Sequence, residues 1–275
     1  MRISRFGRAL FGTSVAGIAV LSLVYGDFAP ILEPSPAWLP WPEVCARGLG
    51  AILLTASVAL FFARTASVGA ITIGVCGMVW AAARARPVLL KPLIIGSWYG
   101  LGEALGPLVG AWILYAVLRR HYGAPAVTAM TGDRALRLAR VLFGAACVAY
   151  GAAHFAYAAY TAKMVPAWLP DPKGLAYLTG AFHAAAGIGL LLGVLPRLAA
   201  TLEAIMISLF GVLVWFPSFF AQPAPEWAPS AQIRWSEAFV TFLLAASAWI
   251  VAASLRGTPR DFAPTVPGDS TTPAK

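Results

Sequence analysis

The sequence predicts an all-α polytopic membrane protein with eight transmembrane helices, arranged as two parallel four-helix repeats. Composition is the first reason. Of the 275 residues 60% are hydrophobic and only 11% are charged, so the polar residues are too few to cover a soluble globule of this size. The second reason is the string PAWLP, which occurs at 36–40 and again at 166–170, each time between two long apolar runs. Its prolines stop helices, and its tryptophan ring is suited to the lipid headgroup level.

Eight apolar windows are long enough to cross about 30 Å of hydrocarbon. They cover residues 9–29, 45–63, 66–83, 93–118, 138–162, 174–195, 198–219 and 235–255. Residues 8–25 match residues 140–157, and both segments contain the string LFG. The first window is therefore half of a repeat, and we expect it to be retained, although the basic N-terminus resembles that of a signal peptide.

This duplication predicts the domain organisation. We expect a first four-helix repeat at 1–118, a cytoplasmic linker at 119–137, a second four-helix repeat at 138–256 and a disordered cytoplasmic tail at 257–275. Because each repeat has an even number of helices, the two copies should have the same orientation in the membrane.

The basic residues predict the orientation. If both termini are cytoplasmic, most of the 20 Lys and Arg residues fall on the cytoplasmic side, as expected for a multi-pass protein of a bacterial inner (plasma) membrane. The cluster Arg84, Arg86 and Lys91 is the exception. The basic residues as a whole lie in short loops between apolar segments and not on one amphipathic face. The net charge of +9 is therefore explained by the orientation of the chain in the membrane, and the lipid bilayer is the expected partner. Nucleic-acid binding is excluded as a function.

Two histidines of the second repeat are candidate ligand-binding residues. His154 near the end of the fifth helix and His183 in the sixth should lie roughly 12 to 14 Å below the outer boundary, at 1.5 Å per residue, so their imidazoles could face each other. A polar aromatic stripe on the fifth helix joins His154 to Tyr150, Tyr157 and Thr161. Thr179 shares a face with His183.

Polar groups at this depth are expensive and tend to face the interior of a helix bundle. Three interpretations of the imidazoles stay open: satisfied interhelical hydrogen bonds, binding of a quinone or other small redox ligand, and ligation of haem. Haem is disfavoured, because it needs a ring-sized gap and no further motif supports it. His154 and His183 align with Ser22 and Leu53 of the first half, so a single site is expected. Gly180, Ala184 and Gly187 should let a neighbouring helix approach closely.

Three acidic residues are candidate buried carboxylates. Glu203 is placed on the cytoplasmic side of the seventh helix, Glu237 at the outer start of the eighth, and Glu103 at the matching place in the fourth. A buried carboxylate either stays protonated or finds a partner. Arg234, at i, i+3 spacing, could pair with Glu237. Together with the histidines, Glu203 and Glu237 could also line a proton path.

Other chemistries lack a signal in the sequence. Cys45, Cys76 and Cys147 are far apart and form no CxxC motif, so we expect them to be packing residues. We find no nucleotide-binding motif, no zinc spacing and no hydrolase triad, and we predict no metal site.

The run GAAHFAYAAYTAKMVPAWLPDPKGLAYLTGAFHAAAGIGLLLGVLPRLAA resembles the DoxX-like family of bacterial integral membrane proteins. The residues that match the family pattern are Tyr177, Leu178, Thr179, Gly180, Gly187 and Arg197. The resemblance covers about 138–255 and is faint in the first half. Many relatives carry an acidic residue where this chain has His183. The resemblance implies a redox neighbourhood, because members are linked to quinone-coupled sulfur oxidation, to membrane partners of oxidoreductases and to oxidative-stress complexes.

The leading hypothesis is a non-haem membrane subunit or partner of a redox system, with a quinone near His154, His183, Tyr150 and Tyr157. It predicts a ligand-sized gap between the fifth and sixth helices. The alternative is a transporter or channel for a small solute or proton, with a polar path that reaches both Glu203 and Glu237. A structural or assembly protein without catalysis is the third hypothesis, and it requires that every buried polar group be paired and that no cavity exist.

Overall fold

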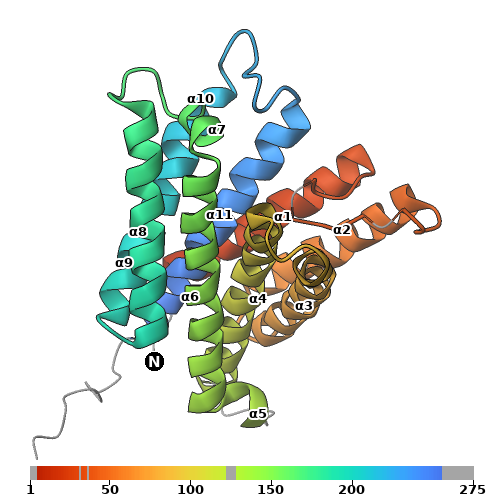
Figure 1. Cartoon of the computed structure of the whole chain (residues 1–275). Helices are drawn as coiled ribbons and strands as arrows, with labels where there is room; N and C mark the ends of the chain where they lie inside the picture. The colour runs from red at the N-terminus through yellow and green to blue at the C-terminus, as the bar shows by residue number, and fades with distance from the viewer. Residues whose placement is uncertain (1–4, 31, 36, 122–127, 256–275) are drawn as a thin grey trace, which may run out of the picture.

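The computed structural model describes residues 5–30, 32–35, 37–121 and 128–255, and these residues form helices and no strands (Figure 1). The expected tail at 257–275 lies outside the described residues. The elements are α1 (Arg5–Tyr25), α2 (Pro42–Ala59), α3 (Ala66–Leu90), α4 (Ile95–His121), α5 (Thr128–Thr131), α6 (Asp133–Ala156), α7 (Ala158–Ala162), α8 (Pro172–Leu192), α9 (Pro196–Phe210), the π-helix η1 (Gly211–Trp215), α10 (Phe216–Ser218) and α11 (Ala231–Ser254).

Within the described residues, eight helical segments are long and apolar enough to cross a membrane. The chain is a multi-pass membrane protein, and the predicted all-α fold class is confirmed. Most boundaries differ from the prediction by a few residues, and the largest differences are in the third and fifth helices. The third helix continues past residue 83 to Leu90, through Arg84 and Pro87. The fifth begins at Asp133 and not at 138, and Asp133 pairs with Arg120 at 2.9 Å. Much of the expected linker is therefore helical, and its residues 122–127 lie outside the described part.

The duplicated loops end in the same local structure. Trp41 (φ 46°) and Asp171 (φ 43°) both adopt the left-handed conformation directly before a proline that starts the next helix. Proline suits the first turn of a helix because its missing N–H would have no helical partner there. Asp171 also caps α8 by accepting a hydrogen bond from the Gly174 N–H at 2.9 Å. The PAWLP repeat thus sets the start of both α2 and α8.

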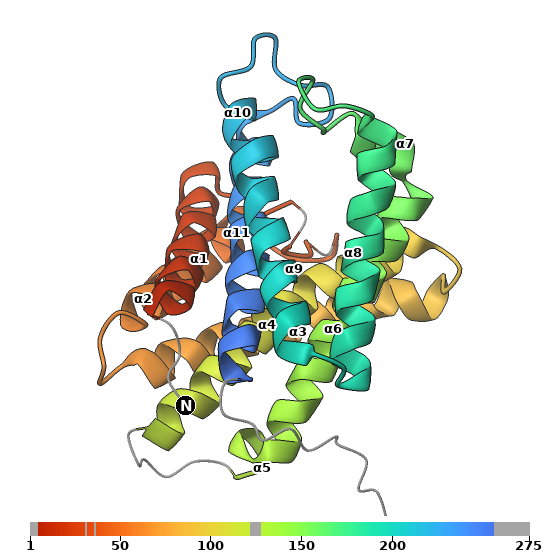
Figure 2. The ribbon, with the colours of Figure 1, turned by 90° about the vertical axis from the view of Figure 1, so that its left-hand side faces the viewer.

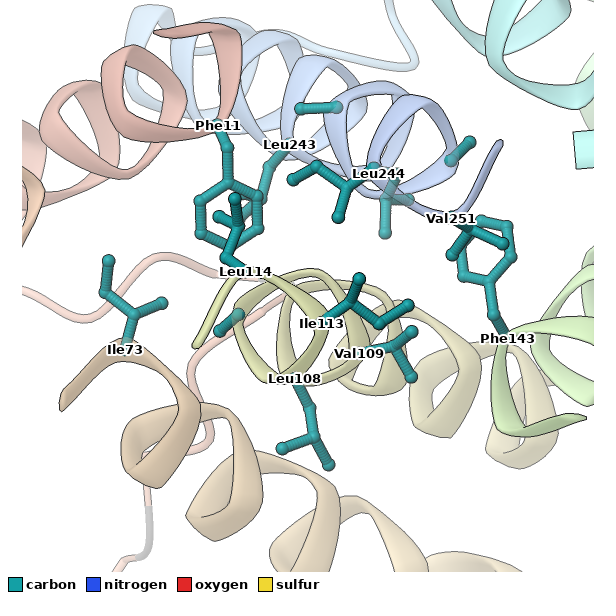
Figure 3. Close-up of a cluster of buried hydrophobic side chains, with 14 of the residues drawn as sticks. Phe11, Ile73, Leu108, Val109, Ile113, Leu114, Phe143, Leu243, Leu244 and Val251 are labelled. Atoms are coloured by element: carbon teal, nitrogen blue, oxygen red, sulfur yellow. The ribbon is translucent and has the colours of Figure 1, made fainter. Parts of the chain in front are cut away.

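The core lies around α4 and α11, which are the most buried spans, with 78% of each span buried. Figure 3 shows side chains of α1, α3, α4, α6 and α11 meeting there, including Phe11, Leu114 and Leu243. Corresponding helices of the two halves make corresponding contacts: α1 packs on α2 as α6 does on α8, and α4 packs on α6 as α11 does on α1. The two halves therefore contact each other between α4 and α6, between α11 and α1, and between α4 and α11. The repeat boundaries themselves stay a prediction.

Helices α8 and α9 of the second half diverge from their shared turn in the shape of a V. Figure 2 shows α8 and α9 joined at one end and standing apart at the other. On its other side α8 packs tightly on α6 through small residues. A Cβ atom added at Gly187 would lie 2.6 Å from the Gly144 carbonyl oxygen, and one at Gly180 would lie 2.8 Å from the His154 Cβ. The predicted close approach of a neighbouring helix at these positions is confirmed.

Candidate functional site

A cavity of about 1380 Å³ lies between α8 and α9 and extends to α4, α6 and α11. Its polar lining includes every residue that the sequence singled out as a candidate. These residues are His154, His183, Tyr150, Tyr157, Thr179, Glu203, Glu237 and Glu103. The lining is otherwise almost entirely apolar.

His183 and Glu203 form the most buried polar contact of the cavity. Nδ1 of His183 lies 2.7 Å from Oε1 of Glu203, and the two residues are 3% and 1% exposed. Glu203 is therefore buried, as predicted, and has a partner in His183, while its place on the cytoplasmic side stays a prediction. The two helices form an antiparallel hairpin, and His183 and Glu203 lie at similar distances along the chain from its turn at Gly193–Leu195.

The hydrogen bonds of His154 favour one tautomer. Its Nδ1 lies 2.9 Å from Thr179 Oγ1 and 3.3 Å from the Ala176 carbonyl oxygen. The Ala176 carbonyl can only accept, and the Thr179 hydroxyl has carbonyl acceptors of its own in Leu175 at 2.8 Å and Ala176 at 3.1 Å. These contacts favour the tautomer in which Nδ1 of His154 donates and Nε2 carries the lone pair. The carboxylate of Glu203 likewise favours the Nδ1–H tautomer of His183, so both imidazoles keep Nε2 for other contacts.

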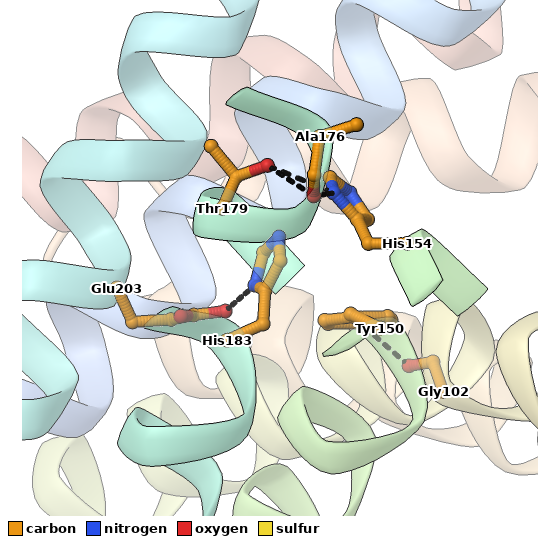
Figure 4. A network of polar contacts seen from close by, with 7 residues as sticks. All are labelled: Gly102, Tyr150, His154, Ala176, Thr179, His183 and Glu203. Carbon is orange, nitrogen blue, oxygen red and sulfur yellow. Dashed lines mark hydrogen bonds and ion pairs between the residues drawn. The ribbon is translucent and has the colours of Figure 1, made fainter. Parts of the chain in front are cut away.

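The two imidazoles face each other, edge to face, with ring centroids 4.9 Å apart. Phe210 of α9 lies against both, at 6.0 Å from the His154 ring and 5.8 Å from the His183 ring. Figure 4 shows the two histidines with Thr179 and Glu203 around them. Rings in mutual contact leave no space for a porphyrin between them, so this arrangement does not suit ligation of one haem iron by both histidines.

Tyr150 connects the histidines to the central helices. Its hydroxyl donates to the Gly102 carbonyl oxygen of α4 at 2.7 Å (Figure 4). Its ring lies 5.7 Å from that of His183 and 5.9 Å from that of Tyr99. Tyr150 therefore packs between the histidines and the N-terminal half of α4.

The predicted stripe on the fifth helix is interrupted. The helix ends at Ala156, Tyr157 leaves helical geometry with φ −115° and ψ 30°, and the chain resumes as α7. The Tyr157 side chain is 44% exposed, and its hydroxyl accepts a hydrogen bond from the Gly96 N–H at 3.0 Å. Tyr157 and Thr161 both line the cavity.

Residues 135–218 match the DoxX family model. The predicted resemblance is confirmed over this segment, which runs from α6 to α10 and carries His154, His183 and Glu203. The matched segment contains the two histidines and both helices, α8 and α9, that enclose the cavity. Helices α4 and α11, which lie outside the matched segment, complete the cavity lining. No curated protein and no solved structure has significant similarity to the chain.

Glu103 and Glu237 lie on α4 and α11, which face the DoxX segment. They are 2% and 7% exposed, and their carboxylates interact electrostatically. The ion pair considered for Arg234 and Glu237 is not formed. Arg234 instead donates to the carbonyl oxygens of Ala228 and Pro229 at 3.0 and 3.1 Å.

The outer walls of the cavity are apolar and exposed. Side chains of α8 and α9 that line the cavity and are at least 42% exposed include Leu178, Phe182, Ile188, Leu202, Ile205 and Leu209. An exposed apolar surface of this kind on a membrane-spanning helix faces lipid. The cavity therefore combines lipid-facing apolar walls with a small number of buried polar side chains.

Two contributors were missed from the sequence. Tyr99 lies beside Glu103, and Phe210 packs on the histidines. Cys147 is a buried core residue, as expected of a packing residue, and its thiol lies beside the Glu203 carboxylate. All three cysteines are free thiols. Among the described residues, no group of three or more His, Cys, Asp or Glu side chains is arranged to hold a metal ion.

Proposed function

We propose that this protein is a membrane component of a redox system and that the cleft between α8 and α9 binds a lipophilic small molecule with a polar ring, of the quinone class. The observation that carries the proposal is the form of the cavity. Its apolar walls open toward lipid, and the His183–Glu203 pair and His154 lie at its interior end. Ligand sites are typically apolar pockets with a few convergent polar groups.

The residues present fit such a ligand. Small-molecule sites usually occupy about 300–1,000 Å³, so 1380 Å³ accommodates a ring together with part of an apolar tail. In the tautomers described above, Nε2 of each imidazole accepts a hydrogen bond from a ligand hydroxyl, and after protonation it donates one to a carbonyl oxygen. A bound quinone would supply two-electron chemistry coupled to protons.

The His183–Glu203 pair is suited to moving a proton at the ligand. When Nε2 of His183 takes a proton from a ligand hydroxyl, the ring becomes an imidazolium whose Nδ1–H already points at a carboxylate 2.7 Å away. That carboxylate stabilises the positive charge in a medium of low dielectric constant. Thr179 holds His154 in a fixed orientation beside it.

Two alanines of α8 allow a direct test with a matched control. Ala185 is exposed and lines the cavity, whereas Ala181 is also exposed and lies outside the cavity lining. Quinones are extracted from the wild-type protein and both variants after gentle purification in detergent. We expect the Ala181→Trp variant to retain quinone and the Ala185→Trp variant to lose it, because the indole fills the cleft. Equal retention by both variants, or none in the wild type, would contradict the proposal.

A second function has one observation in its favour. The cavity reaches both Glu203 and Glu237, as the transporter or channel hypothesis requires. Proteoliposomes with a pH-sensitive dye inside would respond to an acid pulse if protons cross the protein, and the Glu237→Gln substitution would then slow the response. The hypothesis of a purely structural protein is weakened, because a cavity is present and Oε2 of Glu103 is buried with no hydrogen-bond partner among the described residues.

A further inference from the structure

Glu103 and Glu237 occupy corresponding positions in the two halves. Each lies in the N-terminal part of the last helix of its half, α4 or α11, and these two helices contact each other at the centre of the fold. Both carboxylates are buried, and both line the cavity. The pair therefore sits on the interface between the halves, at a separate place from the His183–Glu203 pair.

The groups around the pair carry less positive than negative charge. The guanidinium of Arg84 on α3 interacts electrostatically with Glu103. The phenol of Tyr99 on α4 interacts with both carboxylates. The phenol of Tyr150 on α6 interacts with Glu103. Both phenols are neutral. Oε2 of Glu103 is buried and, within the described part of the chain, has no hydrogen-bond partner. Among the described residues, the positive charge acting on the pair is thus that of Arg84 on Glu103, and one carboxylate oxygen still lacks a donor.

Two adjacent carboxylates in a medium of low dielectric constant do not both ionise, because their repulsion and desolvation are too costly. One bound proton gives the group of Arg84, Glu103 and Glu237 a net charge of zero and supplies the missing donor. We infer that Glu103 and Glu237 together bind one proton, as a shared acid pair on the interface between the two halves. The inference requires no ligand in the cleft.

The pair lies within reach of the histidine site. Tyr99 contacts Glu103, Tyr150 contacts Tyr99, and His183 contacts Tyr150, all along the wall of one cavity. A proton held between Glu103 and Glu237 is therefore positioned to exchange with water or ligand in that cavity. Only this role in exchange rests on the proposed function.

Infrared spectroscopy of the full-length protein in detergent tests the pair, because a protonated carboxyl group has its own carbonyl stretch and shifts in D2O. At neutral pH we expect one such component to be lost in Glu103→Gln and again in Glu237→Gln, since either change leaves one carboxylate opposite Arg84. The exposed Glu226 provides the control, and Glu226→Gln should leave the component unchanged. Glu203→Gln and Glu33→Gln identify the signals of the other buried carboxyl groups.

The Arg84→Met variant provides an independent measurement. Without the cation, both carboxyls should be protonated, so the component should grow to about twice its wild-type intensity. A component that survives both the Glu103→Gln and Glu237→Gln substitutions, or that is absent from the wild type, would overturn the inference. A component that disappears when sodium is added at constant pH would show that the pair binds a metal cation instead. Quinone retention is not part of these readouts, so the two proposals can fail separately.

Discussion

Nδ1 of His183 and Oε1 of Glu203 lie 2.7 Å apart on neighbouring helices, and neither residue is more than 3% exposed. The contact joins α8 to α9 inside the V, where the two helices otherwise enclose a cavity. It orients the imidazole and provides a counter-charge for its protonated form. The same hydrogen bond therefore supports both the shape of the site and its proposed chemistry.

Breaking this contact from one side should destabilise the protein strongly. Glu203→Leu leaves the His183 Nδ1–H buried without an acceptor, and loss of one partner of a buried pair costs about 3–5 kcal/mol. His183→Leu should have a similar effect, and the double variant should be more stable than the sum of the two losses implies. Unfolding in mixed micelles with increasing denaturing detergent measures these free energies. Simple additivity would show that the two side chains do not interact.

The close contact of α6 and α8 predicts a second stability difference. A Cβ atom at Gly187 would press on the Gly144 carbonyl oxygen, whereas one at the exposed Gly48 of α2 meets nothing within 4 Å. Gly187→Ala should lower the free energy of unfolding by about 1–3 kcal/mol. Gly48→Ala should be neutral or slightly stabilising, because alanine is the better helix former. Comparable thermal stability of the two variants would be inconsistent with this packing.

Glu33, in the loop between α1 and α2, predicts a pH dependence of stability. It accepts hydrogen bonds from the Ala29 N–H at 2.7 Å and the Ser22 hydroxyl at 3.3 Å, and burial raises its pKa from 4.5 to about 7. Because the folded-state pKa is the higher one, the stabilisation is complete below pH 4.5. It is lost as the pH rises through about 7, where the unfolded chain is already ionised.

The size of this loss can be measured by comparison with one variant. A pKa rise from 4.5 to about 7 corresponds to about 3 kcal/mol. From acidic to slightly alkaline pH, the unfolding free energy of the wild type should fall by this amount more than that of Glu33→Gln, because the other buried carboxyl groups titrate in both proteins. A wild-type curve that rises over the same interval would contradict the sign of the effect.

The parallel repeat predicts that both PAWLP loops lie on one side of the membrane. Trp38 and Trp168 are 79% and 71% exposed, so a cysteine at either position should react readily. Single cysteines at these positions, in a chain whose three natural cysteines are replaced by alanine, should be labelled from the outer side by a membrane-impermeant maleimide. Labelling from opposite sides would exclude an even number of spans between the loops.

The fold was largely predictable because its signals are local. Apolar length and proline-rich loops define the eight spans, and Gly180 and Gly187 indicate where α6 approaches α8. The end of α3 was missed because Arg84 and Pro87 interrupt the apolar run without ending the helix. The break at Tyr157 also has no clear sequence signal, since the residues around it are apolar and suited to a helix.

The candidate site was predicted as a set of residues but not as a set of contacts. Matched depth made it possible for His154 and His183 to face each other, and their ring centroids do lie 4.9 Å apart. The partnership of His183 with Glu203 was missed because depth was counted from the start of each helix, whereas distance from the shared turn would have matched them. Glu33 was missed entirely, because its burial depends on how a proline-rich loop folds back onto α1.

Binding of a water-soluble quinone analogue to the purified protein tests the central claim most directly. Equilibrium titration should give a measurable Kd for the wild type and for Thr55→Val, an exposed position on α2 outside the cavity lining. His183→Gln should weaken binding about tenfold or more, because a lost hydrogen bond to a charged group is worth about 1.5–3 kcal/mol and 1.4 kcal/mol is tenfold in affinity. The same Kd for all three proteins, or no binding to any of them, would contradict the account.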